Sequence, residues 1–428
     1  MSSLPPLAKR ACTAHNASTC EAFDLRIRTM YAHNHKPQPM SCVEITPTIS
    51  HQTKEYGLSL IVLADVSGSM LYDNKLQRMR EGIVRLGELS SRFAAVRTDL
   101  TVIAFSDSAQ VLLSSPTVPS VDELRKVCDD LAPCGGTNIG SALREAMGIA
   151  KSKMDKAVHV ALFTDGEDGY NLQNTLQKHE SFVEVMASHP MLCVHCVGIC
   201  SGIDCALLDT ISRTARRGTF QSVSEDNISM LMGAMWGLMI EAVDATSYVR
   251  IDIDGAPFID RKDVVLRICD PPKSCVVPVL HVPQGAKEIA ATLVIGTDSF
   301  KTVTLTLGET AFCDETDPVC NFEYARHLHA ECCTQVALAL RCGDYDKAAK
   351  LNMDAREALL QLPSESTTTA VSELEAQAHE IDHARQNREA ARELEAREMS
   401  RAATERNYGV SIDPTSRSLS DLQTQLLF

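Results

Sequence analysis

The sequence predicts an α/β fold built on a doubly wound, mostly parallel β-sheet, followed by a small antiparallel β unit and a helical C-terminal region. Between residues 57 and 243, apolar runs alternate with amphipathic helical segments, and residues 246–310 hold short alternating runs separated by Pro, Gly and Asp. Charged helical segments follow. The chain has 428 residues, more than one hydrophobic core usually organises, so we expect two or three domains.

The strands of the parallel sheet are expected to be continuous apolar runs, because helices cover both of its faces. These runs are GLSLIVLAD (57–65), LTVIAF (100–105), AVHVALFTD (157–165), MLCVHCVGI (191–199) and GTFQSV (218–223). Helical spacing of apolar residues predicts helices over 75–93, 121–131, 140–153, 172–187 and 228–243. The methionine stripe of the last helix predicts a packed core face rather than a partner groove; it comprises Met230, Met232, Met235 and Met239.

The rest of the chain divides by composition. We expect an N-terminal arm or edge-strand segment over 1–56, the main domain over 57–243, a small β domain over 246–310, a helical pair over 320–362, a Ser/Thr linker over 364–369, a long charged helix over 372–406 and a flexible tail over 407–428. The long helix has a thin apolar seam of Leu374, Ile381 and Leu394. This seam predicts either packing along one narrow face or a projecting, coiled-coil-like arm that could self-associate.

Charge and cysteine usage narrow the class of protein. The net charge of −15 argues against general affinity for nucleic acid or anionic membranes, which require a basic surface. No apolar run is long enough to span a membrane, and the first residues lack the apolar stretch of a secretory signal. Sixteen cysteines spread over so long a chain indicate reduced thiols rather than a disulfide framework, so we expect a cytoplasmic protein.

Three short motifs are expected to carry the chemistry, each where a strand ends or a helix begins. They are DVSGS (65–69), GGTN (135–138) and FTDGE (163–167). Alternation along the first motif lets one carboxylate and two hydroxyls point into the same concavity. Such oxygen donors suit a hard cation, Mg²⁺ or Mn²⁺, and Mg²⁺ usually keeps coordination positions that water or an outside ligand fills. Strand ends are also where open α/β sheets bind ligands.

These motifs resemble the D-x-S-x-S, threonine and aspartate elements of the metal-ion-dependent adhesion site of von Willebrand factor A (VWA) domains, a Rossmann-like fold. The resemblance covers residues 57–243. It implies that Ser67, Ser69 and Thr137 are hydroxyl ligands of the cation, and that Asp65 and Asp165 bind it directly or through water. It also implies that an Asp or Glu of a protein or peptide partner completes the coordination, and it implies no catalytic residue.

The order of the C-terminal parts is similar to the region that follows VWA domains in intracellular eukaryotic proteins, which sometimes carry a Hint (hedgehog/intein) module or a RING finger. No splicing-type Hint segment and no RING spacing of cysteines and histidines occur here. We therefore infer neither autoprocessing nor ubiquitin-ligase activity.

Simpler interpretations compete at several positions. The DVSGS loop could merely cap a helix, although capping does not account for Thr137 and Asp165. Glu167 and Asp168 are expected to be solvated loop carboxylates rather than ligands. The last helix is expected to expose a charged, solvated face.

Cysteines and histidines offer a second set of metal candidates. Cys193 and Cys196 should point to opposite faces of a strand, so with Cys200 they are expected to be buried apolar residues rather than a metal or redox motif. His159 and His195 are expected to be satisfied core histidines. A zinc site is possible but not favoured, for lack of a C-x-x-C pair, among Cys313, Cys320, His327, His329, Cys332, Cys333 and Cys342.

The leading hypothesis is an intracellular, cation-dependent protein-binding module and not an enzyme. One alternative is a metal-assisted phosphohydrolase with Asp65 as nucleophile; it is disfavoured because Ser67 stands where such hydrolases place a second aspartate. Another is an adaptor or scaffold in ubiquitin transfer or another assembly, in which the long helix would matter more than the metal.

Overall fold

The computed structural model divides the chain into two compact units. One comprises Met1–His51, Ser247–Cys320 and Gly409–Ile412, and the other comprises Gln52–Thr246, Asn321–Tyr408 and Asp413–Phe428. The structure describes residues 23–31, 39–47, 57–92, 97–165, 192–199, 203–215, 217–223, 247–257, 264–265, 275–279, 286–295, 298–306, 318–407 and 410–411, and isolated positions between 168 and 239.

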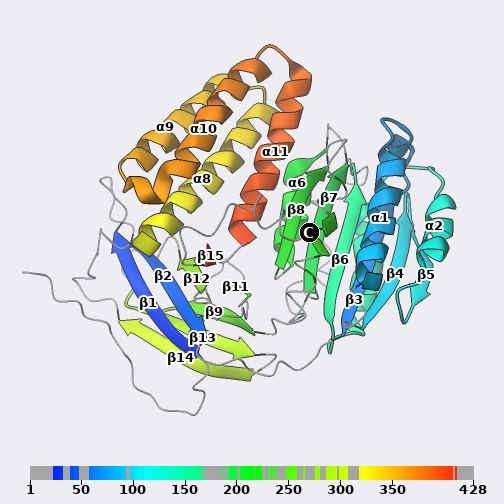
Figure 1. Ribbon diagram of the computed structural model, residues 1–428, viewed down its shortest axis with the longest axis horizontal. Coiled ribbons are helices and arrows are strands. Elements are labelled where there is room, and N and C mark those ends of the chain that lie inside the picture. The colour runs from blue at the N-terminus through cyan, green and yellow to red at the C-terminus, as the bar shows by residue number, and fades with distance from the viewer. Residues whose placement is uncertain are drawn as a thin grey trace, which may run out of the picture. The chain divides into compact units, whose positions relative to one another are not determined.

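A six-stranded sheet forms the centre of the second unit, with strand order β5-β4-β3-β6-β7-β8 (Figure 1). Every neighbouring pair is parallel except β4 and β5, so the predicted mostly parallel sheet is confirmed. The bounds are β3 Leu58–Asp65, β4 Thr98–Phe105, β5 Ala109–Ser115, β6 Ala157–Thr164, β7 Leu192–Ile199 and β8 Arg217–Val223. Strand β5 was not predicted, because it is a half-exposed edge strand without a continuous apolar run.

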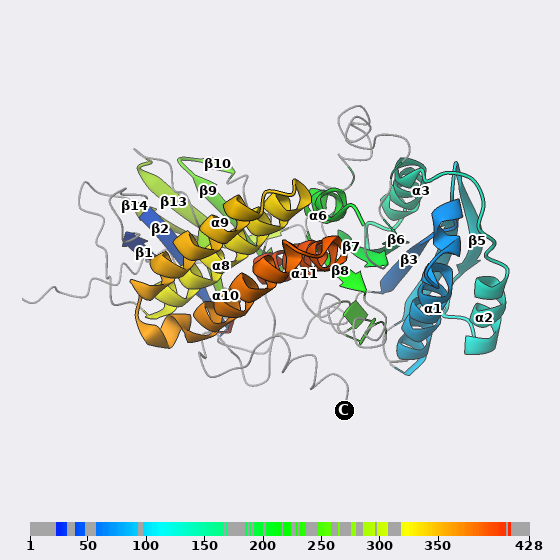
Figure 2. The ribbon, with the colours of Figure 1, turned by 90° about the horizontal axis from the view of Figure 1, so that it is seen from above.

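Helices cover both faces of this sheet, as Figure 2 shows for α1 on one face and α3 on the other. The bounds are η1 Gly68–Leu71, α1 Lys75–Arg92, α2 Val121–Asp129, α3 Ile139–Lys151 and α6 Cys205–Thr214. The predicted helices over 75–93, 121–131 and 140–153 are thereby confirmed, whereas α6 was not predicted. Most of the helix predicted over 172–187 lies outside the described residues.

The methionine stripe is part of the protein core. Met232, Met235 and Met239 are buried in the same apolar cluster as the α1 residues Met79 and Ile83. The predicted core role of the stripe is therefore confirmed at these positions, and Met230 lies outside the described residues.

The first unit consists of two antiparallel sheets. One has the order β1-β2-β12-β15 and the other β10-β9-β13-β14, with β11 paired to β9. The bounds are β1 Phe23–Tyr31, β2 Pro39–Pro47, β9 Ser247–Ile253, β10 Ala256–Pro257, β11 Val264–Val265, β12 Cys275–Val279, β13 Glu288–Ile295, β14 Asp298–Thr306 and β15 Val410–Ser411. The segment expected to be an arm or edge strand supplies the edge strand β1 and also β2, which lies between β1 and β12.

Four C-terminal helices follow, and they belong to the second unit from Asn321 onward. They are α8 Pro318–Arg341, α9 Tyr345–Leu360, α10 Ser364–Ala384 and α11 Arg388–Asn407. The single helix predicted over 372–406 is in fact two, because Asn387 starts a new helix by accepting hydrogen bonds from the backbone N–H groups of Glu389 and Ala390. The expected Ser/Thr linker over 364–369 is the first part of α10. Its Thr368 hydroxyl donates back to the Ser364 carbonyl, which satisfies the side chain within the helix.

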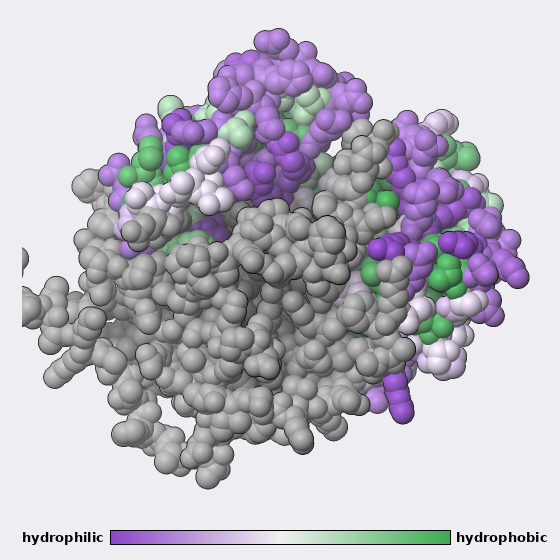
Figure 3. Space-filling view, viewed as in Figure 1, coloured by the Kyte–Doolittle hydropathy of each residue, from purple (hydrophilic) through white to green (hydrophobic). Residues whose placement is uncertain are grey.

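The apolar seam of these helices is covered within the chain. The core of the helical bundle contains Leu374, Ile381 and Leu394. The predicted packing along one narrow face is therefore confirmed, and the alternative of a projecting arm is wrong. Helix α11 also packs against β8 and α6 (Figure 1). Figure 3 shows mostly hydrophilic residues on the visible surface of this bundle. Among the described helices, none is long and apolar enough to cross a membrane.

We expect Leu374→Ala to lower the free energy of unfolding by about 2–5 kcal/mol, because the smaller side chain leaves a cavity in the buried core of the bundle. Leu374 is 0% exposed, whereas Leu360 on α9 is 59% exposed, so Leu360→Ala is the matched control and should change stability by less than about 0.5 kcal/mol. Urea denaturation monitored by circular dichroism measures both. Equal losses in the two variants would contradict the packing described for the bundle.

Candidate metal-binding site

The predicted site lies where β3, β4 and β6 end at one edge of the central sheet. Strands β3 and β6 are adjacent and parallel, with Ala64 opposite Phe163. Asp65, the last residue of β3, therefore lies beside Thr164, the last residue of β6, and beside the following residue Asp165. The sheet register thus brings together two of the three motifs.

Asp65 is a fully buried carboxylate that accepts hydrogen bonds from Ser67 and Thr164. Its Oδ1 accepts from the Ser67 backbone N–H at 2.8 Å, and its Oδ2 accepts from the Thr164 hydroxyl at 2.6 Å. Burial raises the pKa of Asp65 to about 6, and the nearby Asp165 adds to this rise while the hydrogen bonds oppose it. This environment penalises an isolated negative charge and favours a cation close to it.

The three predicted hydroxyl ligands line one groove, formed by Ser67, Ser69 and Thr137 with the glycines beside them. Ser67 Oγ lies 3.0 Å from Ser69 Oγ. The loop after β3 is joined to the loop before α3, since Cys134 N–H donates to the Val66 carbonyl and Gly68 N–H donates to the Gly135 carbonyl. Ser67 precedes η1 but makes no side-chain capping hydrogen bond, so helix capping does not explain this loop.

Asp165 is 2% exposed, and its two oxygens differ in environment. Oδ2 accepts a hydrogen bond from Lys75 Nζ at 3.0 Å. Oδ1 is buried without a hydrogen-bond partner among the described residues, and buried carboxylate oxygens rarely stay so. Lys75, the first residue of α1, was not predicted, because nothing in the local sequence indicates which carboxylate it meets.

Asp107 was also missed by the sequence analysis. Its Oδ1 accepts from Gly136 N–H at 2.9 Å, and its carbonyl accepts from the Asn138 side chain at 3.0 Å. Gly135 has a φ of 69°, and a Cβ there would lie 2.4 Å from Asp107 Oδ2, so only glycine fits. Asp107 thereby positions the loop that carries Thr137. Its place just after β4, at the same sheet edge, is the signal that could have identified it.

The structure describes one of the two acidic residues that follow Asp165 and that were expected to be solvated. Asp168 lines the groove, and its Oδ1 accepts from the Ile139 backbone N–H at 3.3 Å. It therefore contacts the first residue of α3 and is more than a solvated loop carboxylate. Glu167 lies outside the described residues.

The residues at this edge fit a hard divalent cation. The donors are three hydroxyls and two carboxylates, which is the oxygen chemistry that Mg²⁺ and Mn²⁺ prefer. The buried carboxylates Asp65 and Asp165 can carry two negative charges, whereas Lys75 brings one positive charge to them. Asp165 Oδ1 also has no hydrogen-bond partner among the described residues.

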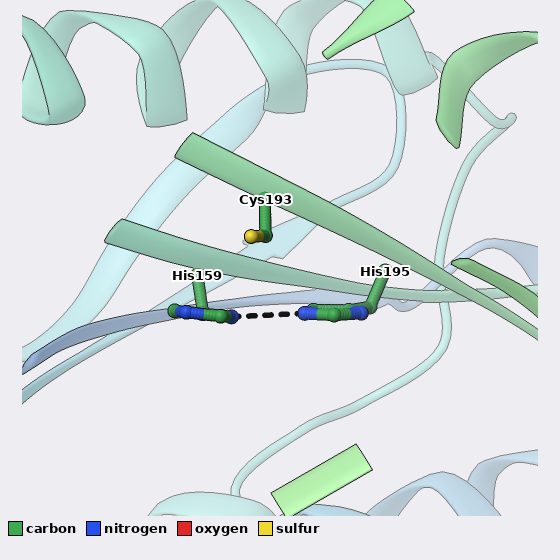
Figure 4. A group of neighbouring side chains, drawn as sticks. All are labelled: His159, Cys193 and His195. Atoms are coloured by element: carbon green, nitrogen blue, oxygen red, sulfur yellow. Dashed lines mark hydrogen bonds between the residues drawn. The ribbon is translucent and has the colours of Figure 1, made fainter. Parts of the chain in front are cut away.

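His159, Cys193 and His195 form a second group of potential metal ligands, buried in the central sheet (Figure 4). His159 Nδ1 and His195 Nε2 share a hydrogen bond of 2.9 Å, and His195 Nδ1 bonds the Thr219 hydroxyl at 2.9 Å. Burial lowers the pKa of His195 to about 4, so this imidazole is neutral. Three of the four ring nitrogens thus take part in hydrogen bonds within the core, in agreement with the prediction of core histidines.

The structure describes eight cysteine side chains, and the predictions for the other cysteines lie outside the described residues. Cys196 packs in the apolar cluster that includes Val194 and α6 residues, away from the group of His159 and Cys193, so the two cysteines diverge as predicted. Cys200, Cys313 and Cys320 have no described side chains. Cys333 Sγ lies 3.8 Å from His329 Nε2, and among the described residues no three metal ligands gather around this pair.

Comparison with known proteins agrees with this architecture. Residues 60–167 match the family model described as von Willebrand factor type A domain. A von Willebrand factor type A protein from Catenulispora acidiphila has a similar structure, with a TM-score of 0.60, 15% identity, and coverage of 84% of this chain and 89% of that chain. The ArnB paralog VWA2 from Sulfolobus acidocaldarius has a TM-score of 0.52 and 12% identity over 89% of this chain and 99% of that chain. No curated protein matches the sequence. Residues 60–167 are therefore similar to von Willebrand factor type A domains, and the solved structures share the fold.

Proposed function

We propose that Ser67, Ser69, Thr137, Asp65 and Asp165 hold Mg²⁺ or Mn²⁺, and that the cation binds an Asp or Glu carboxylate of a protein partner. The observation that carries this proposal is that three hydroxyls line one groove beside two buried carboxylates. When bound, the cation supplies the positive charge that attracts the partner's carboxylate. The VWA domain is then an intracellular protein-binding module.

Binding rather than catalysis is part of this proposal. Ser67 occupies the position where a phosphohydrolase with an Asp65 nucleophile would need its second carboxylate. The Asp65 oxygens both accept hydrogen bonds from neighbouring groups, which suits a fixed supporting role. A scaffold role of the C-terminal helices is compatible with cation-dependent binding, because their apolar seam is buried and their visible surface is mostly hydrophilic (Figure 3).

The intracellular location rests on the cysteines. Among the eight described cysteine side chains no disulfide occurs. Burial raises the pKa of Cys128 to about 11 and that of Cys332 to about 12, so these thiols stay protonated and unreactive at neutral pH. Reduced, buried thiols are typical of proteins from a reducing compartment.

Asp65→Asn tests the metal site with little change of shape. We expect the affinity for Mn²⁺ to fall at least about tenfold, because a charged group beside the cation becomes neutral. Thr137→Val, which replaces a hydroxyl with a methyl group, should act in the same direction. Isothermal titration calorimetry of each variant with Mn²⁺ gives the affinity.

The matched control is Asp155→Asn. Asp155 is an exposed carboxylate just before β6, at the opposite edge of the sheet, so its loss should leave Mn²⁺ affinity unchanged. Wild-type protein that binds no Mn²⁺ and no Mg²⁺, or an Asp65→Asn variant that binds as the wild type does, would refute the proposed site.

Lys75→Met should make stability depend more strongly on the cation. Lys75 and Asp165 form a largely buried ion pair, with side-chain exposures of 13% and 3%, and removing one partner of such a pair costs on the order of 3 kcal/mol. In EDTA the variant should unfold at a lower temperature than the wild type. Saturating Mg²⁺ should recover much of the difference, because a ligand stabilises the state that binds it. Thermal unfolding in EDTA and in Mg²⁺ measures this, and an equal loss in both buffers would contradict it.

A further inference from the structure

The groove that contains the three hydroxyls extends well beyond the candidate metal site. Its volume is about 1190 Å³. It begins at Ser67, Ser69 and Thr137, and it continues along the turn between α8 and α9 and the turn between α10 and α11. All of these residues belong to the same compact unit. A ligand that binds at the hydroxyls and extends along the groove would therefore lie beside the ends of the C-terminal helices.

Four arginines line this groove, in a chain whose net charge is −15. Two of them have carboxylate partners: Arg341 pairs with Asp204 at 2.6 Å, and Arg385 pairs with Asp346 at 2.8 Å. Arg388 and Arg392 form no hydrogen bond or salt bridge within the described part of the chain. They are exposed in the first turns of α11 and four residues apart, so they share one face of the helix.

Acidic residues that line the groove offset these two charges only in part. Asp204 is already paired with Arg341, whereas Asp168 keeps its negative charge while it accepts the Ile139 backbone N–H. Burial raises the pKa of Glu395 to about 7 although Arg341 and Arg392 oppose the rise, so this carboxyl is only partly charged at neutral pH. The N-terminus of α11, where Arg388 lies, adds the positive end of the helix dipole.

We propose that this groove binds an extended acidic segment of a partner protein, with one carboxylate directed to the cation site and further carboxylates on Arg388 and Arg392. The proposal rests on the proposed function, because the first carboxylate needs the cation. Arginine recognises carboxylates through paired, charge-assisted hydrogen bonds. The arginines then determine which acidic segments bind, whereas the cation alone would accept any exposed carboxylate.

The charge distribution favours an acidic protein segment over a nucleic acid. Binding of a nucleic acid draws its strength from many phosphate contacts on a basic surface. Here two unpaired arginines lie in a groove of a strongly acidic chain. A polyanion longer than the groove would meet repulsion outside it, whereas a short acidic segment of a folded partner would not.

The test uses the full chain and a fluorescein-labelled decaglutamate peptide, with binding followed by fluorescence anisotropy in Mg²⁺ and in EDTA. We expect the double variant Arg388→Glu/Arg392→Glu to bind the peptide at least tenfold more weakly in Mg²⁺. The matched control is Lys347→Glu/Lys350→Glu, which makes the same charge change on exposed positions of α9 that do not line the groove. This control should weaken binding less than twofold.

Each outcome separates the groove from the metal site. Mn²⁺ titration of the same variants reports the metal site alone, and the arginine double variant should keep wild-type Mn²⁺ affinity. Normal Mn²⁺ affinity with unchanged peptide binding in the arginine variant overturns the groove proposal and leaves the proposed function standing. No Mn²⁺ binding by the wild type refutes the proposed function itself.

Two further results would also overturn the groove proposal. One is the absence of Mg²⁺-dependent decaglutamate binding by wild-type protein that binds Mn²⁺. The other is stronger competition by a ten-nucleotide single-stranded DNA than by unlabelled decaglutamate. If the charge-reversed variant does not fold, as judged by circular dichroism, Arg388→Gln/Arg392→Gln replaces it, with an expected loss of at least threefold.

Discussion

A carboxylate at the buried end of β3 sets the constraint that the neighbouring loops satisfy. A negative charge inside a protein is unfavourable unless donors or cations surround it. Asp65 therefore accepts hydrogen bonds from the Ser67 backbone N–H and the Thr164 hydroxyl. The Lys75 ammonium group donates to the adjacent Asp165 and offsets its negative charge. These contacts connect the ends of β3 and β6 with the start of α1. The loop that holds Thr137 is fixed to the same place through Val66, Gly68 and Asp107. The concave, oxygen-rich edge follows from stabilising this one buried group.

The central sheet and the core of the candidate site could be predicted because their signals are local. Continuous apolar runs mark buried parallel strands, and DVSGS places its side chains within one short loop. Strand β5 escaped prediction because it has no continuous apolar run. Helix α6 was missed although Asp204 caps its N-terminus by accepting a hydrogen bond from the Leu207 backbone N–H. Lys75 and Asp107 escaped because their partners are distant in the chain: the Lys75 ammonium meets Asp165, and Asp107 meets Gly136. Such contacts depend on the sheet order, which the local pattern does not contain.

The C-terminal region shows how one small residue can redirect a long charged segment. The sequence favours an uninterrupted helix because charged residues and alanine dominate it. Asn387 instead ends one helix and caps the next, and the chain reverses there. As a result Leu374 and Leu394 meet in one core, while Met399 and Ala403 join the apolar cluster of the central sheet. The turn at Arg385–Arg388 is thereby placed on the groove beside the strand ends, which a straight helix would not do.

The pairing of β2 with β12 has a consequence for how the chain is made. Ile45 lies opposite Cys275, and the six-stranded sheet is encoded between them. During synthesis the hairpin of β1 and β2 is made before the parallel sheet, so the other edge of β2 stays without its partner β12 while the residues of that sheet are translated. Unpaired strand edges invite association with other chains. The edge of β2 is thus open to association with other chains until residues 275–279, which form β12, have been synthesised.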